Sequence, residues 1–285
     1  MAPCPSARNA LAPHTYTFYR QSLLALHAAQ VPFLIGGAYA LEHYTGVTRQ
    51  TKDLDLFVQS HDLHRTLAVL RAAGYHTELT SSHWLGKANA GEDYIDVVFS
   101  GGNGIANVDE TWFTHAVEGE ILDLPVRFCP PEEMLWSKAY VMERERYDGA
   151  DIAHLLRACG EEFDWPRLLH RFGLHWRVLC SHLLLFGFIY PAERSLIPHW
   201  VIQELVSRWL REEGSALPTE RLCQGTLLSR AQYLIDIQEW GYGDGRLPPT
   251  GNLTAENVAQ WTAAIQEQGE SNDSPKGECA SGSHR

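Results

Sequence analysis

The sequence predicts an α/β (α+β) fold, in which strands and helices alternate up to residue 130 and helices alone follow. Between residues 31 and 129, short apolar runs and period-2 alternation are interrupted by helical spacing. After Pro130-Pro131, apolar residues recur every three or four positions and few strand signals remain. With 285 residues, of which 45% are apolar and 20% charged, the chain has a globular composition and the length of one large domain or two modest ones.

The first predicted elements surround a pair of glycines. Residues 15–30 carry apolar side chains along one stripe, which predicts an amphipathic helix. Residues 31–35 are an apolar run that ends at Gly36-Gly37, as expected of a buried strand that stops at a tight turn. Residues 38–44 then follow with helical spacing and end near a glycine, which is a common helix C-cap.

The next predicted strand carries alternating acids. Residues 53–58 read DLDLFV, and this alternation of acidic and apolar side chains is typical of a strand. A helix over residues 62–73 ends at Gly74. Four further strands are expected before the two prolines, with a glycine-rich loop at residues 101–104 between the third and the fourth; they cover residues 76–80, 84–88, 94–99 and 121–129.

The change of pattern at Pro130 predicts a domain boundary. We expect a first domain over residues 1–130 and a helical domain over residues 131–265. The helical domain would contain five helices, over residues 131–146, 148–160, 165–172, 174–187 and 197–212. Residues 266–285 are rich in Gly, Ser, Glu and Asn and have no apolar face to bury, which predicts a disordered tail.

Charge and hydropathy restrict the partners that we expect. The net charge of −12 argues against binding of duplex DNA, because affinity for the DNA backbone depends on neutralising phosphates with Lys and Arg. The longest apolar run, residues 183–190, is far shorter than the roughly 20 residues of a membrane span, so we expect no membrane partner. The N-terminal residues lack the apolar region of a signal peptide, and we expect a cytoplasmic protein with reduced thiols.

The segment from residue 34 to residue 58 carries the chemistry. In a strand, Asp53 and Asp55 point to the same side and present two carboxylates together, which suits Mg²⁺. Asp96 lies in another apolar strand, where a buried carboxylate is costly unless it has a partner such as a metal ion. Gly36 and Gly37 have no Cβ, and the helix that follows them offers free N–H groups to a phosphate.

In these motifs the chain resembles the nucleotidyltransferases of the DNA polymerase β superfamily. The 15 residues between Gly37 and Asp53, with Thr48-Arg49-x-Thr51 before the acids, are most similar to bacterial antibiotic nucleotidyltransferases and abortive-infection type toxin nucleotidyltransferases. The resemblance implies a mixed sheet flanked by helices and followed by an all-helical domain. It also implies a phosphate-binding turn at the two glycines, and metal ligands at Asp53, Asp55 and, as the third acid, Asp96.

A second segment is similar to the toxin branch, which carries a Lys early in a helix, then an Arg, then an acidic pair. The residues that fit this order are Lys138, Arg144 or Arg146, Asp148 and Asp151. Lys138 either faces a phosphate or lies on the surface, and the two acids either take part in catalysis or stabilise the start of the next helix. Arg49 either contacts a phosphate or pairs with one of the metal-binding acids when the metal is absent.

The expected reaction is therefore transfer of a nucleoside monophosphate from a nucleoside triphosphate to a hydroxyl or phosphate acceptor, with Mg²⁺ as cofactor and pyrophosphate as product. The acceptor is a small molecule, an RNA or a protein. Two alternatives remain: a catalytically silent nucleotide- or partner-binding protein of the same fold, and a toxin that modifies tRNA. Residues 138–177 contain 7 basic and 7 acidic residues, so that region offers no net positive track for RNA.

Overall fold

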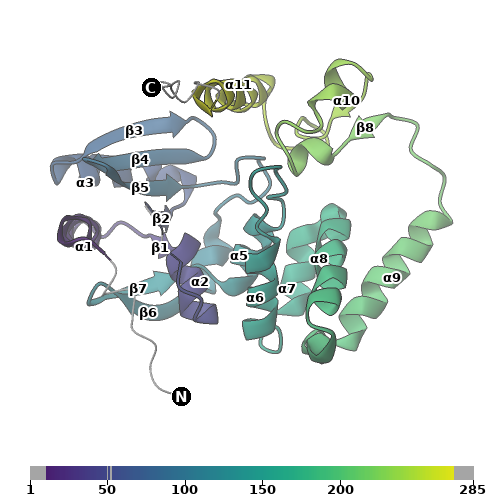
Figure 1. Ribbon diagram of the computed structural model, residues 1–285, viewed down its shortest axis with the longest axis horizontal. Coiled ribbons are helices and arrows are strands. Elements are labelled where there is room, and N and C mark those ends of the chain that lie inside the picture. The colour runs from purple at the N-terminus through teal and green to yellow at the C-terminus, as the bar shows by residue number, and fades with distance from the viewer. Residues whose placement is uncertain (1–10, 50, 52, 273–285) are drawn as a thin grey trace, which may run out of the picture.

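The computed structural model describes residues 11–49, 51 and 53–272, and its centre is one mixed seven-stranded sheet (Figure 1). The strands lie in the order β3-β4-β5-β2-β1-β7-β6; β2 runs parallel to β5 and β1 parallel to β7, and the other pairs are antiparallel. Their bounds are β1 (Leu34–Ile35), β2 (Asp53–Phe57), β3 (His76–Ser81), β4 (Leu85–Ala90), β5 (Asp93–Val98), β6 (Val117–Ile121) and β7 (Leu124–Phe128). The expected mixed sheet is confirmed.

α1 (Pro13–Ala28) and α3 (Leu63–Ala72) cover one face of the sheet, and α2 (Gly37–Thr45) lies beside the other. α1 and α3 contact each other, and α3 packs on β3 and β4. Leu67 of α3 lies against Gly86, so α3 covers the face that also carries the buried Leu54 and Ile95. Side chains alternate across a strand, so the acids of β2 and β5 point to the opposite face. α2 begins beside that second face.

Five helices follow the sheet, as the spacing predicted, but the first is shorter than expected. They are α5 (Pro131–Lys138), α6 (Gly149–Cys159), α7 (Trp165–Phe172), α8 (Trp176–Ile189) and α9 (His199–Glu213). The predicted helix over residues 131–146 ends at Lys138, because the following residues form a small hairpin closed by a bridge between Met142 and Tyr147. Its tip is held by contacts from residues 229–230, far along the chain, which local spacing cannot reveal.

Two further expectations were wrong in detail. The predicted strand 121–129 is the end of β6 followed by β7, since Leu122 and Asp123 both have positive φ and reverse the chain between the two strands. The short helix α4 (Glu110–Thr114) had no clear signal in the sequence. After α9 the chain is not all helical, because β8 (Leu222–Cys223) and β9 (Gly243–Asp244) form a two-stranded parallel sheet.

The end of the described chain is helical. α10 (Leu234–Gln238) is followed by α11 (Ala255–Asn272), which continues past residue 266, where the sequence predicted a disordered tail to begin. The rest of that predicted tail, residues 273–285, lies outside the described residues.

Within the part of the chain that the structure describes, one helical stretch, Trp165–Ile189, is long and apolar enough to cross a membrane by length and composition alone. It comprises α7, a 3₁₀ turn (Gly173–His175) and α8. Its buried side chains, among them Leu168, Leu179 and Phe186, belong to the hydrophobic core. Only 33% of its apolar window is buried inside the fold, and a single helix of this kind is weak evidence for a membrane span.

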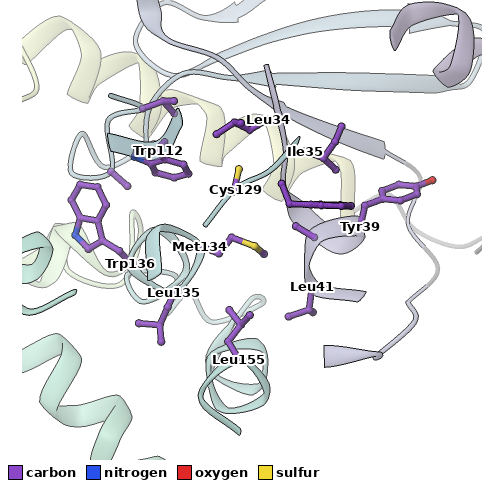
Figure 2. Close-up of a cluster of buried hydrophobic side chains, with 14 of the residues drawn as sticks. Leu34, Ile35, Tyr39, Leu41, Trp112, Cys129, Met134, Leu135, Trp136 and Leu155 are labelled. Atoms are coloured by element: carbon purple, nitrogen blue, oxygen red, sulfur yellow. The ribbon is translucent and has the colours of Figure 1, made fainter. Parts of the chain in front are cut away.

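The hydrophobic core runs without a break from the sheet into the helices. Figure 2 shows side chains of β1 and α2 in one cluster with those of α5 and α6. The labelled members of this cluster are Leu34, Ile35, Tyr39, Leu41, Trp112, Cys129, Met134, Leu135, Trp136 and Leu155. The position of α5 and α6 against the sheet is therefore set by apolar burial, which has no preferred direction.

A buried ion-pair network adds directional contacts across the same boundary. The Glu133 carboxylate, at the centre, is 0% exposed and lies 3.2 Å from Arg167 Nη1 and 3.1 Å from Arg171 Nε. Arg167 also pairs with Glu132, at 2.6 Å, and Arg171 pairs with both oxygens of Asp109, at 2.6 and 2.8 Å. Asp109 caps α4, so the network joins the sheet half of the chain to α5 and α7.

Replacing the central acid tests this network. Glu133→Gln should lower the free energy of unfolding by about 3 kcal/mol, because removing one partner of a buried ion pair leaves the other charges inadequately compensated. The measurement is urea unfolding at neutral pH. Glu161→Gln, which changes an exposed acid, is the matched control and should alter stability by less than about 0.5 kcal/mol. A loss below about 1 kcal/mol for Glu133→Gln would show that the core alone holds the helices in place.

Candidate active site

Two neighbouring parallel strands bring three carboxylates together. Asp53 and Asp55 lie on β2, and Asp96 lies on β5 directly opposite Asp55 in the register. One carboxylate oxygen of each residue lies within 4.8 Å of the others, and all three residues are half-buried. The sequence predicted these three residues as one cluster. The structure brings them together because β2 and β5 pair in parallel, although about forty residues separate Asp55 from Asp96.

Burial and neighbouring acids make two of the carboxyl groups bind protons more tightly than usual. Burial, followed by the charges of Asp53 and Asp96, raises the pKa of Asp55 to about 7, against the opposing effect of Lys138 and Arg146. Burial also raises the pKa of Asp96, against the opposing effect of its ion pair with Lys87. Such clustering of like charges is unfavourable without a cation. Three hard oxygen donors at this spacing fit a divalent cation such as Mg²⁺.

Lys87 is a site residue that the sequence analysis did not find. It lies on β4 opposite Asp96, and its Nζ is 3.0 Å from Asp96 Oδ1 and 4.2 Å from the centre of the Tyr94 ring. Its position in the strand predicted above for residues 84–88 was the only available signal. The register that places it across from an acid comes from the pairing of β4 with β5.

The two glycines lie where the sequence placed them, at the junction of β1 and α2. Gly37 begins α2 with a φ of +53°, a conformation that favours glycine. A Cβ at Gly37 would overlap the carboxylate of Asp55, and a Cβ at Gly36 would overlap the ring of Phe57. The space that a side chain at Gly37 would need is thus occupied by the carboxylate of Asp55. A substitution at Gly37 would displace Asp55 as well as any phosphate near the turn.

The residues before β2 also reach the acids. The Thr51 hydroxyl donates a hydrogen bond to the Asp53 carboxylate. Arg49 forms an ion pair with Asp151 at the start of α6, a partner that neither of the two readings from the sequence had named. The loop between α2 and β2 is thus bonded to β2 through Thr51 and to the helical half through Arg49.

A cluster of alternating charges lies beside the carboxylates. Lys138 Nζ lies 2.9 Å from Asp148 Oδ2 and 2.8 Å from Asp151 Oδ2, and Arg146 contacts both oxygens of Asp148, at 3.1 and 3.2 Å. Burial lowers the pKa of Lys138, but Asp148 and Asp151 outweigh it and raise that pKa above its ordinary value. Lys138 is therefore charged.

The sequence left open whether Arg144 or Arg146 belongs to this cluster. The side chain of Arg144 is 81% exposed and pairs with Glu145, so Arg146 is the arginine that belongs to it.

The chain matches one family model and is similar to several solved structures. A family model described as "Uncharacterised nucleotidyltransferase" matches residues 21–186. Among solved structures, the chain is similar to the antibiotic-resistance factor ANT(2'')-Ia, with 20% identity, 60% of this chain and 98% of that chain covered, and a TM-score of 0.43. It is also similar to the lincomycin-bound lincosamide antibiotic adenylyltransferase LnuA, with 17% identity, 49% and 94% covered, and a TM-score of 0.35.

A third similar structure is JHP933 from Helicobacter pylori, with 13% identity, 72% of this chain and 97% of that chain covered, and a TM-score of 0.37. A comparison with curated proteins finds no match.

The raised pKa of Asp55 predicts how the stability of the metal-free protein depends on pH. The folded state holds a proton on this residue up to pH of about 7, whereas the unfolded chain releases it near pH 4, so the folded state binds more protons between these values. Stability should therefore fall as the pH rises from about 4 to about 7. Between about pH 4 and about pH 7, the free energy of unfolding of Asp55→Asn should fall by at least about 1 kcal/mol less than that of the parent, since one pKa unit corresponds to about 1.4 kcal/mol. Urea unfolding at several pH values, with a chelator present, measures it; parallel declines in the parent and the variant would contradict the assignment.

Lys87 predicts a response to Mg²⁺. Lys87→Met should lower the thermal stability of the metal-free protein, because Asp96 loses its partner while three acids remain close together. Mg²⁺ should then raise the melting temperature more in the variant than in the parent, as the ion replaces the missing positive charge. Lys87→Arg keeps the charge and is the control. Equal Mg²⁺-dependent shifts in Lys87→Met and the parent would show that Lys87 does not compensate the acidic cluster.

Proposed function

The chain belongs to the nucleotidyltransferase family whose model matches residues 21–186, and from this premise we propose that it transfers a nucleoside monophosphate from a nucleoside triphosphate to a hydroxyl or phosphate acceptor. The reaction would depend on Mg²⁺ and release pyrophosphate. The observation that carries the proposal is the approach of Asp53, Asp55 and Asp96 within 4.8 Å, at the start of a glycine turn and a helix. A protein of this fold that only bound a partner protein would have no need to maintain three mutually repelling carboxylates.

In this proposal Asp53 and Asp55 hold Mg²⁺, with Asp96 as a further ligand. The ion supplies positive charge that neutralises the triphosphate during an in-line displacement. Asp53 is oriented by Thr51, and Asp55 by the close approach of Gly37. The protein therefore fixes its two main ligands before the substrate arrives, which is the kind of preorganisation that phosphoryl transfer needs.

Asp96 is also placed to take up a proton. The acceptor oxygen would form a bond to the α-phosphorus, the bond between that phosphorus and the bridging oxygen to the β-phosphate would break, and the acceptor's proton would pass to a carboxylate oxygen of Asp96. Its raised pKa makes this carboxylate a stronger base than an ordinary aspartate. Lys87, 3.0 Å away, would keep it oriented.

The basic side chains divide into two groups by exposure. Arg49 and Arg146 have side chains that are 43% and 69% exposed, so they can reach phosphate oxygens from solvent. Lys138 is 16% exposed and held by two carboxylates, so we assign to it a fixed positive charge beside Asp55 in the nucleotide site. Gly36, Gly37 and the start of α2 would receive the terminal phosphates.

Removing one metal ligand tests the function. Asp53→Asn should reduce pyrophosphate release to less than about a tenth of the parent rate, since each 1.36 kcal/mol of lost transition-state stabilisation costs about tenfold. The change is nearly isosteric, so the variant should melt cooperatively and lose Mg²⁺ affinity. The assay uses each nucleoside triphosphate with Mg²⁺ and a cell extract as the source of acceptor, with labelled nucleotide to show where the label goes.

Glu92→Gln, at the exposed turn between β4 and β5, removes one negative charge outside the site and is the matched control. It should keep the parent activity. Nucleotide binding without pyrophosphate release over a broad acceptor screen would instead support the catalytically silent alternative. Label recovered in tRNA would support the toxin alternative.

A further inference from the structure

The part of the chain after α9 returns to the sheet. Residues 222–263, which we call the C-terminal arm, include β8, β9, α10 and the first turns of α11. In Figure 1 this arm lies above β3 and above the loops that join the sheet to the helices, far along the sequence from both. The family match ends at residue 186, so the arm lies wholly outside it.

The arm is docked on the sheet half by side-chain hydrogen bonds to two loops. Asn103 donates through Nδ2 to the carbonyl of Leu227, at 2.9 Å, and Asn103 is itself buried. Asn252 donates to the carbonyl of Gly104, at 3.1 Å. Beyond β3, Ser82 donates to Gln260, at 3.0 Å. These contacts fix the arm relative to the strands that carry the acids.

The arm also holds the small hairpin that enters the active site. We call residues 141–148 the Arg146 hairpin. The N–H of Met142 donates to the carbonyl of Leu228, at 3.1 Å. At the tip, the Glu143 carboxylate accepts three hydrogen bonds: from Ser229 Oγ at 2.7 Å, from Arg230 N at 3.1 Å and from Arg230 Nε at 3.0 Å.

These three bonds form in a protected setting. Ser229 is 1% exposed, and the Glu143 side chain is 17% exposed. Hydrogen bonds to a charged group are stronger than neutral ones, and losing a partner at a shielded site is costly. Glu145, two residues further along the tip, has a side chain that is 82% exposed, and its carboxylate lies 3.8 Å from Arg144 Nε.

The far end of the hairpin lies in the active site. Arg146 and Asp148 bind each other there, and the positive charge of Arg146 acts on Asp55. The hairpin is closed by one isolated bridge between Met142 and Tyr147 and by the hydrogen bond from Asp148 N to the carbonyl of Val141, so its own backbone contacts are few. An anchor on the opposite side of the tip would therefore decide where Arg146 is held.

We propose that the C-terminal arm positions the nucleotide site through Glu143, which acts as a latch between residues 229–230 and the Arg146 hairpin. Glu143 is a positioning residue, since it acts through Arg146 and touches no reacting atom. The inference rests on the proposed function, and it extends that function to a segment outside the family match. Because coupling between two sites is reciprocal, nucleotide binding should in turn strengthen the docking of the arm.

The test compares Glu143→Ala with Glu145→Ala in the full chain. We expect Glu143→Ala to weaken binding of the preferred Mg²⁺–nucleoside triphosphate among ATP, GTP, CTP and UTP by about tenfold, a typical size for coupling between sites. The KM for that nucleotide should rise by a similar factor while kcat changes by less. Calorimetric titration and steady-state pyrophosphate release measure the two effects. Glu145→Ala, on the same tip, should match the parent in both.

Three additional measurements separate the latch from a general loss of structure. Glu143→Gln should recover much of the affinity, because its amide oxygen can still accept from Arg230 while its amide NH₂ donates to Ser229 Oγ. Ser229→Ala should weaken binding too, and adding it to Glu143→Ala should cost little more, since both changes break one connection. In the parent, Mg²⁺–nucleotide should slow amide hydrogen exchange in residues 225–230, and this protection should be lost in Glu143→Ala.

The possible failures are distinguishable. If the parent chain binds no nucleotide and releases no pyrophosphate, the proposed function fails and the inference fails with it. If the parent binds nucleotide but Glu143→Ala and Glu145→Ala bind it equally well, the inference alone is overturned. Faster exchange in the hairpin of Glu143→Ala with unchanged nucleotide affinity would also overturn it, because the latch would then be structural only.

Discussion

The electrostatic cost of three carboxylates within 4.8 Å is the constraint on which the rest of this structure depends. Strand pairing places Asp55 opposite Asp96, and β2 and β5 alone leave the repulsion between the acids uncompensated. Positive charge must therefore come from other elements, and it does: Lys87 from the next strand, and Lys138 and Arg146 from the helical half. A site of this kind is poised to gain a cation, since binding one relieves a repulsion that folding has already imposed.

This constraint explains why the two halves of the chain are joined so firmly. The positive charges of the helical half are useful only where they face the acids, so small changes in the position of α5 or α6 would change the site. An unbroken apolar core holds α5 and α6 against the sheet, and the network around Glu133 adds directional contacts between α5, α7 and the start of α4. Apolar burial contributes most of the free energy that stabilises this packing. The buried ion pairs fix the orientation of these helices, because charged partners tolerate little displacement.

Local sequence patterns predicted most of the helices and strands. They failed where contacts with distant parts of the chain determine the structure of a segment. The strands with clear alternation, such as β2 and β5, and the helices with clear stripes, such as α7, were predicted within a few residues. The helix predicted through residue 146 was wrong, because a hairpin held by residues 228–230 replaces its second half. The strand predicted over 121–129 was wrong for a local reason, the positive φ of Leu122 and Asp123, which neither residue type signals strongly.

The sequence by itself determined the chemistry of the site: two acids that a strand must turn to the same side, a third acid in another apolar strand, and a glycine pair before a helix. These follow from periodicity and residue type, which are local properties. Only the tertiary structure decided which charges accompany the acids. Lys87 reaches Asp96 through strand register, Arg49 reaches Asp151 across the two halves, and Glu143 meets Ser229 over more than eighty residues. Such pairings depend on how whole elements pack, and packing is set by the shape of the assembled core rather than by any short stretch of the chain.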